Sequence, residues 1–172
     1  MELEVLQYPD PRLKKIAAPI REITPAIRQL AADMAASMYA HNGIGLAAPQ
    51  IGESVRMIVT DISGSSGRNS LKVYINPVLE KLDEETVVSE EGCLSVPDYR
   101  SNVKRSARVR ILAQDLEGSP VEHAAEDLEA VCLQHECDHL DGKLFIDRIS
   151  HLKRVLYNSK LKKKLMADSS PL

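Results

Sequence analysis

Two histidines four residues apart, with a glutamate directly after the first, form the most specific chemical pattern in the chain: His135-Glu136-Cys137-Asp138-His139. Side chains at positions i and i+4 of a helix lie on one face, so both imidazoles can bind one metal ion. Glu136 stands beside them as a candidate base. The alternative interpretation is an ordinary helix surface, and it is disfavoured because such a match arises by chance about once in a hundred such sequences.

A hydrolytic metal site needs a third protein ligand and an open position for water. In one class of metalloproteases the pattern continues as HExxHxxGxxH, and the chain follows it to Gly142 but has Phe145 in place of the third His. Further candidates downstream are Asp141, Asp147 and His151, the last two expected beyond the end of the helix. Upstream, Cys93 offers a thiol in a strand-like segment, beside a glycine that lets another backbone approach. Cys93 is the better third ligand, although a lone cysteine is more often buried and inert.

We expect an α+β fold around these residues, with one helix set among antiparallel strands. We expect the motif helix over about 127–140, ending near Gly142. Thr24 as N-cap and Pro25 at the first helical position predict an N-terminal helix over 24–42, with Gly43 as its stop. A C-terminal helix is expected over about 150–166. Short β-type runs are found at 55–62, 72–82, 86–89 and 108–116, and 63–70 is predicted to be a surface loop.

Composition limits the class of protein. The 172 residues fit one domain, 1–172, and the net charge of −3 indicates no attraction to nucleic acid in general. With no Trp, five Tyr and one Phe, the chain is not expected to bind nucleic acid by aromatic stacking, and no sequence-specific nucleic-acid partner is expected. No apolar run suits a secretory signal or a membrane span. Three cysteines make no paired framework, so we expect reduced thiols in the cytoplasm.

Three segments together resemble the signature motifs of peptide deformylases, in the same order. They are Gly43-Ile44-Gly45-Leu46-Ala47-Ala48-Pro49-Gln50, Glu91-Gly92-Cys93-Leu94-Ser95 and Gln134-His135-Glu136-Cys137-Asp138-His139. The likeness includes Tyr8-Pro9-Asp10-Pro11-Arg12-Leu13 and Ile75-Asn76-Pro77, so it spans nearly the whole chain up to about Ile149. The chain resembles a bacterial-type member. The resemblance implies hydrolysis of the N-formyl group from the formylmethionine of nascent polypeptides, with release of formate.

The resemblance also implies roles for individual residues. Cys93, His135 and His139 would hold one divalent metal ion. The helix that bears the two histidines would lie centrally against antiparallel or mixed β-structure. The oxyanion of the tetrahedral intermediate would receive hydrogen bonds from the Gln50 side chain and the Leu94 backbone N–H. Glu136 would take the proton of the attacking water and pass it to the departing amine.

Helical spacing suggests the pocket for the methionine side chain. Val131 and Cys132 lie four and three residues before His135 and face the same way, whereas Cys137 points to another side and is expected to pack. The expected substrate-binding residues are Ile44, Gly45, Leu94, Arg100, Val131 and Cys132. Gly43 and Gly45 offer a backbone edge to which a peptide can add as a strand, or merely a helix stop and turn. Arg100 matches a family position that contacts the substrate backbone.

Two rival functions follow from the same residues: a metallopeptidase that cuts internal bonds, and a metal-bound interaction module without catalysis. The second has no need for Glu136 or Gln50. Family resemblance implies Fe²⁺ as the working metal, while affinity trends favour Zn²⁺, Ni²⁺ or Co²⁺ in purified protein. The last predicted helix carries six Lys and Arg residues and no Asp or Glu over 150–166, which suggests a surface helix or weak docking on the ribosome.

Overall fold

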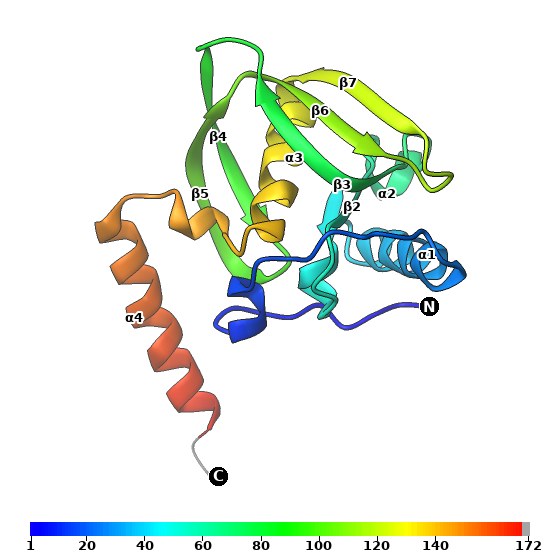
Figure 1. Cartoon of the computed structure of the whole chain (residues 1–172). Helices are drawn as coiled ribbons and strands as arrows, with labels where there is room; N and C mark the ends of the chain where they lie inside the picture. The colour runs from blue at the N-terminus through cyan, green and yellow to red at the C-terminus, as the bar shows by residue number, and fades with distance from the viewer. Residues whose placement is uncertain (170–172) are drawn as a thin grey trace.

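The computed structural model describes residues 1–169, in which one helix, α3, lies between two antiparallel sheets (Figure 1). The elements in chain order are η1 (Pro11–Lys14), α1 (Pro25–Ala40), β1 (Gly45–Ala47), η2 (Ala48–Ile51), β2 (Met57–Thr60), α2 (Gly64–Gly67), β3 (Lys72–Lys81), β4 (Thr86–Cys93), β5 (Val96–Ser106), β6 (Arg108–Gln114), β7 (Pro120–Glu126), α3 (Asp127–Leu140), η3 (Phe145–Asp147) and α4 (His151–Asp168). The predicted α+β class is confirmed. Among residues 1–169, no helix combines the length and apolar character needed to cross a membrane.

The larger sheet has five strands in the order β1-β2-β3-β6-β7, and the smaller sheet pairs β4 with β5. All neighbouring strands are antiparallel. The register of β3 shifts between Ile75 and Val78, where Asn76 has a positive φ of 52° and Pro77 has no N–H to donate. The Asn76 amide exchanges two hydrogen bonds of 2.8 Å with the backbone of Ile20. The bulge therefore ties the N-terminal segment to the sheet.

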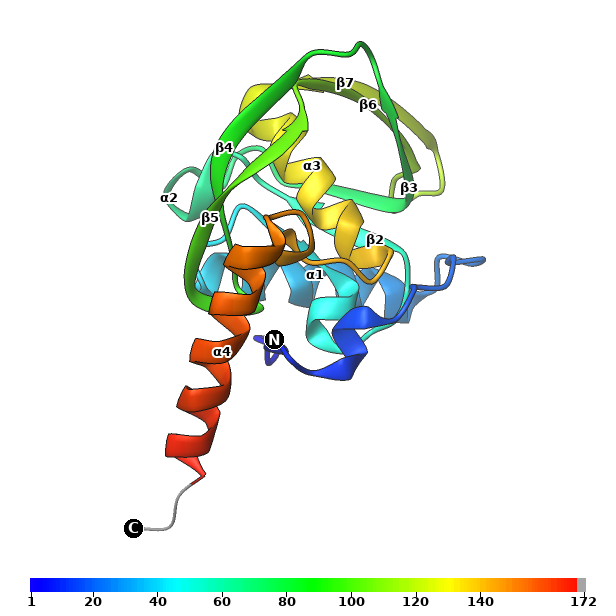
Figure 2. The same cartoon turned by 90° about the vertical axis from the view of Figure 1, so that its left-hand side faces the viewer.

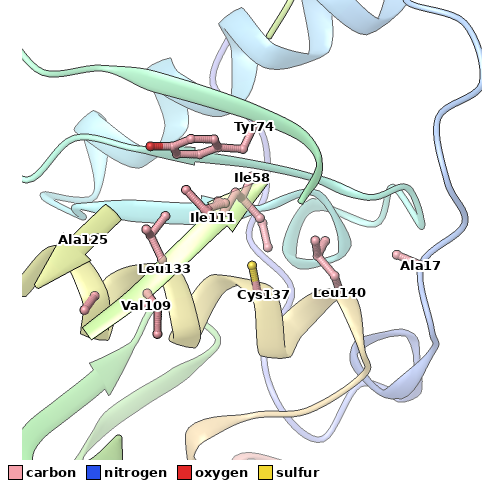
Figure 3. Packing of buried hydrophobic residues seen from close by; sticks show 11 residues of the cluster. Ala17, Ile58, Tyr74, Val109, Ile111, Ala125, Leu133, Cys137 and Leu140 are labelled. Atoms are coloured by element: carbon pink, nitrogen blue, oxygen red, sulfur yellow. The ribbon is translucent and has the colours of Figure 1, made fainter. Parts of the chain in front are cut away.

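The larger sheet is covered on both faces near β2. All four β2 residues are buried: Ile58 packs toward α3, while Met57 and Val59 pack with residues of α1. Figure 3 shows the hydrophobic core between the larger sheet and α3, where Ile58, Tyr74 and Ile111 of the sheet meet side chains of α3. Burying one large apolar side chain contributes about 1.5–3 kcal/mol. This packing holds α3 against the sheet.

The N-terminal helix forms for the predicted reasons but ends earlier. The Thr24 hydroxyl accepts a hydrogen bond from the backbone of Ile27, and Pro25 is the first helical residue. The expected inner face is found: Ala31, Met34 and Met38 are buried, with Ile27 and Leu30 packed against them. Gly43 was expected to stop the helix, but the helix ends at Ala40 and Asn42 adopts the left-handed conformation (φ 55°). Asn tolerates this conformation because its short polar side chain can bond locally.

The four predicted strands are present with altered ends, whereas three strands were missed. The run predicted at 86–89 continues to Cys93, which places the thiol at the end of β4. The missed strands are β1, β5 and β7. In β5, the buried Arg105 breaks the alternation of apolar and polar residues that sequence reading depends on. The predicted loop at 63–70 contains the short helix α2.

The motif helix has the predicted bounds, and Gly142 follows it with a positive φ of 72°. A Cβ on Gly142 would lie 2.3 Å from the carbonyl oxygen of Lys14. The glycine is needed for close packing of the N-terminal segment against the helix end. This packing explains why Gly142 matches the HExxHxxG pattern, so the match does not require a protease function. The last helix, α4, begins after the N-cap Ser150 and extends away from the rest of the molecule, with Tyr157 as its buried residue (Figures 1 and 2).

Candidate metal centre and active site

The ligand atoms of Cys93, His135 and His139 lie within 4.8 Å of one another. Cys93 Sγ is 3.4 Å from His139 Nε2. The two histidines stand one turn apart on α3, and β4 brings the cysteine to them from the smaller sheet. Burial and the neighbouring His135 lower the pKa of His139, which keeps its imidazole in the neutral form that binds metals. One sulfur and two nitrogen donors suit a divalent transition metal, with room for a further ligand.

A carboxylate orients the first histidine. Nδ1 of His135 is 2.9 Å from Glu91 Oε1, so its Nε2 is left to face a metal ion. Arg105, with a side chain only 2% exposed, donates two hydrogen bonds of 2.8 and 2.9 Å to Glu91. Its remaining terminal nitrogen donates to Asp138 at 2.6 Å. Burial alone would raise the pKa of Glu91, but the hydrogen bonds and charges of Arg105 and His135 lower it to about 2. Glu91 is therefore held as an anion.

Glu136 is buried beside the metal ligands, where burial raises its pKa to about 7. Its Oε2 has no hydrogen-bond partner among the described residues. A carboxyl group with a pKa near neutrality can both accept and return a proton, as a general base that later acts as an acid must do. A Cβ at Gly45 would lie 2.6 Å from Glu136 Oε1 and 2.9 Å from Cys132 Sγ. Gly45 is thus required for the close approach of β1 to α3.

Hydrogen bonds at both the oxygen and the nitrogen of its side-chain amide hold Gln50 in place. Its oxygen accepts a hydrogen bond from Ala47 N at 2.9 Å, and its nitrogen donates to Ser95 Oγ at 3.1 Å. The same nitrogen is 3.5 Å from Cys93 Sγ. The amide is only 2% exposed and lies in η2, directly after β1. Its N–H donors therefore face the metal centre and are not those of a surface amide.

One cavity of about 650 Å³ brings most of the predicted site residues together. From the predicted set, its lining includes Ile44, Gly45, Gln50, Cys93, Leu94, Arg100, Val131, Cys132, His135 and Glu136. His139 lies behind this wall, 1% exposed. Cys137 faces away from the cavity and packs in the core with Leu133 and Leu140, where Figure 3 shows it. The expectation that Cys137 is a packing residue agrees with this position.

Arg100 and Gly92 face each other across the β4-β5 ribbon. The Arg100 side chain is 63% exposed, and its Nε donates to Glu90 at 2.8 Å. A Cβ on Gly92 would lie 2.7 Å from Arg100 Nη1. The sequence suggested that this glycine admits another backbone, which was wrong: it admits the guanidinium of Arg100. Arg100 thus lies at the rim of the cavity, next to the strand that carries Cys93.

Phe145, at the position of the third histidine in the protease pattern, is a core residue only 1% exposed. Its ring stacks on that of His135, with centroids 6.2 Å apart and planes at 23°. The other downstream candidates, Asp141, Asp147 and His151, are exposed and outside the ligand cluster. Sequence reasoning left Glu91 without a role, although it contacts the candidate ligand His135. Its spacing of two from Cys93, along one strand, is the signal that places both side chains on one face.

Comparisons with known proteins agree on one family. The family model described as polypeptide deformylase matches residues 2–155. A peptide deformylase from Acinetobacter baumannii (strain SDF) is 52% identical over 161 residues, which cover 94% of this chain and 90% of that relative. The crystal structure of a peptide deformylase from Legionella pneumophila superposes with a TM-score of 0.88 at 41% identity, over 99% of this chain and 100% of that one. A Met-Ala-Ser-bound structure of the class I type b enzyme from Acinetobacter baumannii has a TM-score of 0.80 at 37% identity, over 87% of this chain and 99% of that one.

Removing the buried guanidinium should strongly destabilise the fold. Arg105→Ala leaves the carboxylates of Glu91 and Asp138 without their shared partner, and breaking a buried pair in this way costs about 3–5 kcal/mol. Arg108→Ala is the matched control, because Arg108 pairs with Asp83 at the surface and such pairs contribute at most about 1 kcal/mol. Urea unfolding of the metal-loaded variants measures both losses. Equal losses for the two variants would contradict a central role for Arg105.

Proposed function

Since the chain belongs to the polypeptide deformylase family, we propose that it removes the formyl group from the N-terminal formylmethionine of nascent polypeptides through the residues grouped around Cys93. Its class is that of a metal-dependent hydrolase acting on N-formyl peptides. The observation that carries the assignment of roles is the buried Glu136, which lines the same cavity as Cys93 and His135 of the ligand cluster. We assign the whole chain, 1–172, to one catalytic domain.

Cys93, His135 and His139 would hold the metal ion. When bound, the ion supplies a Lewis acid and lowers the pKa of water in its open position. Glu136 takes a proton from the attacking water, whose oxygen forms a bond to the formyl carbon. The bond from that carbon to nitrogen then breaks, and Glu136 returns the proton to the leaving amine. Formate and a free N-terminal methionine are the products, and no covalent link to the protein forms.

The oxyanion of the tetrahedral intermediate would be stabilised by the Gln50 amide and the Leu94 backbone N–H. Donors that are already oriented act without reorganisation, which is the source of their catalytic effect. The hydrogen bonds of Gln50 to Ala47 and Ser95 supply that orientation. Glu91 acts through His135, whose imidazole it orients.

The nascent peptide would bind along the free edge of β1, which ends the five-stranded sheet. Residues of β1 and β4 both line the cavity, so an extended peptide would add there as a strand. Backbone hydrogen bonds of this kind give affinity with little regard to sequence. The methionine side chain would enter the apolar part of the cavity formed by Ile44, Leu94, Val131 and Cys132. Arg100 would contact the peptide backbone at the rim.

The experiment that tests these roles compares two substitutions in a coupled assay on formyl-Met-Ala. Glu136→Gln should retain the metal yet lose about 10²–10⁴-fold in turnover, because the proton carrier is gone and the ligands remain. Cys93→Ala should lose the metal itself. Metal analysis and initial rates separate the two effects. Full activity of Glu136→Gln would overturn the mechanism, and cleavage of casein by a metal-loaded Cys93→Ala protein would support the metallopeptidase instead.

We propose ferrous iron as the working metal, although Zn²⁺, Ni²⁺ or Co²⁺ can fill the same ligands. A thiolate ligand weakens zinc as a Lewis acid, and zinc is stable with four ligands, whereas Fe²⁺ more readily accepts a fifth. Protein loaded with iron without oxygen should turn over much faster than the zinc form and lose activity in air, where Cys93 is also open to oxidation. Equal rates for forms of verified metal content would refute the choice of iron. We place the enzyme in the cytoplasm, where thiols stay reduced.

We further propose that α4 gives weak docking on the ribosome. Two of its cations are paired, Lys164 with Asp98 and Arg154 with Asp147. Four are exposed and have no acidic partner among residues 1–169: Lys153, Lys160, Lys162 and Lys163. Replacing Lys160 and Lys163 with Ser should reduce co-sedimentation with ribosomes at low salt and leave deformylation of formyl-Met-Ala unchanged. Unchanged co-sedimentation would remove the proposal.

A further inference from the structure

A second cavity of about 570 Å³ lies on the side of α3 opposite to the metal centre. The α3 residues that line it are Gln134, Cys137 and Asp138, with Asp141 directly after the helix. The α3 residues that line the metal cavity are Leu128, Val131, Cys132, His135 and Glu136. Each set follows helical spacing along its own face, and the two cavities share no lining residue. The second cavity is therefore a separate site.

Its lining is basic although the chain as a whole is acidic. The cations are Arg56, Lys81, Lys104, Arg105 and Arg148, and the carboxylates are Asp138 and Asp141. Both carboxylates are already paired: Asp138 with Arg105 and Arg148, and Asp141 with Arg56. Lys81 and Lys104 have no acidic partner within residues 1–169. Two unpaired ammonium groups on different strands thus line one cavity in a chain of net charge −3.

The rest of the lining is mixed: Thr86, Ser106 and Gln134 are neutral and polar, and one side is apolar. Pro77, Val78, Leu79 and Val109 line the side formed by the larger sheet, and Val78 is 57% exposed. The cationic residues Lys104 and Arg105 come from β5 of the smaller sheet, and Figure 2 shows these two sheets on either side of α3. Small-molecule sites are typically of this size and combine apolar walls with a few convergent polar groups. The occupant should therefore carry an anionic group beside a less polar body.

We propose that this cavity binds a phosphate-bearing ligand of nucleotide size, with Lys81 and Lys104 on the phosphate and the apolar wall against the base. Lysine is a common phosphate ligand, because its ammonium is a compact charge on a flexible stem. The phosphate belongs either to a free nucleotide or to an RNA backbone, since both offer the same anion and an adjoining base. The ligand would also touch Arg105 and Asp138. Arg105 pairs with Glu91, and Glu91 in turn contacts His135.

The test uses metal-loaded full-length protein and three probes: ADP, adenosine and a short RNA hairpin. Calorimetric titration should give saturable binding of ADP or of the hairpin, and none of adenosine, which lacks phosphate. Lys81→Ser with Lys104→Ser should weaken the binding about tenfold or more. Lysine acetylation read by mass spectrometry should show protection of Lys81 and Lys104 by the bound probe.

The matched control is Lys15→Ser with Lys143→Ser, which removes the same charge from two exposed lysines that do not line the cavity. The control should bind like wild type, and all variants should deformylate formyl-Met-Ala equally, which shows that they are folded. Cavity-dependent binding of ADP assigns the phosphate to a free nucleotide, and cavity-dependent binding of the hairpin alone assigns it to RNA. Equal weakening by both pairs of substitutions, or no saturable binding of either probe, overturns the proposal.

Discussion

The guanidinium of Arg105 on β5 joins β4 and α3, the two elements that carry the candidate metal ligands. It extends from β5 to Glu91 on β4, two residues before Cys93, and to Asp138 on α3, one residue before His139. Removing charges from water is costly, and such a group contributes little net stability compared with an apolar replacement. Its value lies in geometry, because only one arrangement of ribbon and helix satisfies all three charges. The distance between the thiol and the imidazoles depends on that arrangement.

Each face of the helix α3 has a different role. Glu136 and His135 face the metal cavity, Leu133, Cys137 and Leu140 contribute to the core, and Asp138 faces the second cavity. Cys137 lies within the metal motif but takes part in packing, and its thiol has a pKa raised by burial. The helix is consequently buried along most of its length, and few of its residues could change without a cost to packing, orientation or charge.

Local signals in the sequence predict several of the elements that form the site. The motif helix, the N-cap of α1 and the inner face of α1 follow from patterns within a few residues, and the structure agrees with them. The β5 strand was not predicted, because Pro97, Asp98 and the buried Arg105 disturb its alternation. The partnership of Glu91 with Arg105 was also missed, since it spans 14 residues and depends on how two strands pair. The roles proposed for Gln50 and Leu94 came from family resemblance, because no local pattern in the sequence indicates them.

The late position of α3 in the chain has a consequence for the making of the protein itself. Synthesis proceeds from the N-terminus at roughly 5–20 residues per second, so all seven strands emerge before the helix that they enclose. Until Leu140 has left the ribosomal exit tunnel, the inner faces of both sheets cannot pack against α3. The apolar side chains on those faces of β2, β3 and β6 remain exposed to water. Non-local pairing of this kind is slow to form and exposes chains to aggregation. For several seconds, the growing polypeptide thus carries the strands of both sheets without the helix that will fill the space between them.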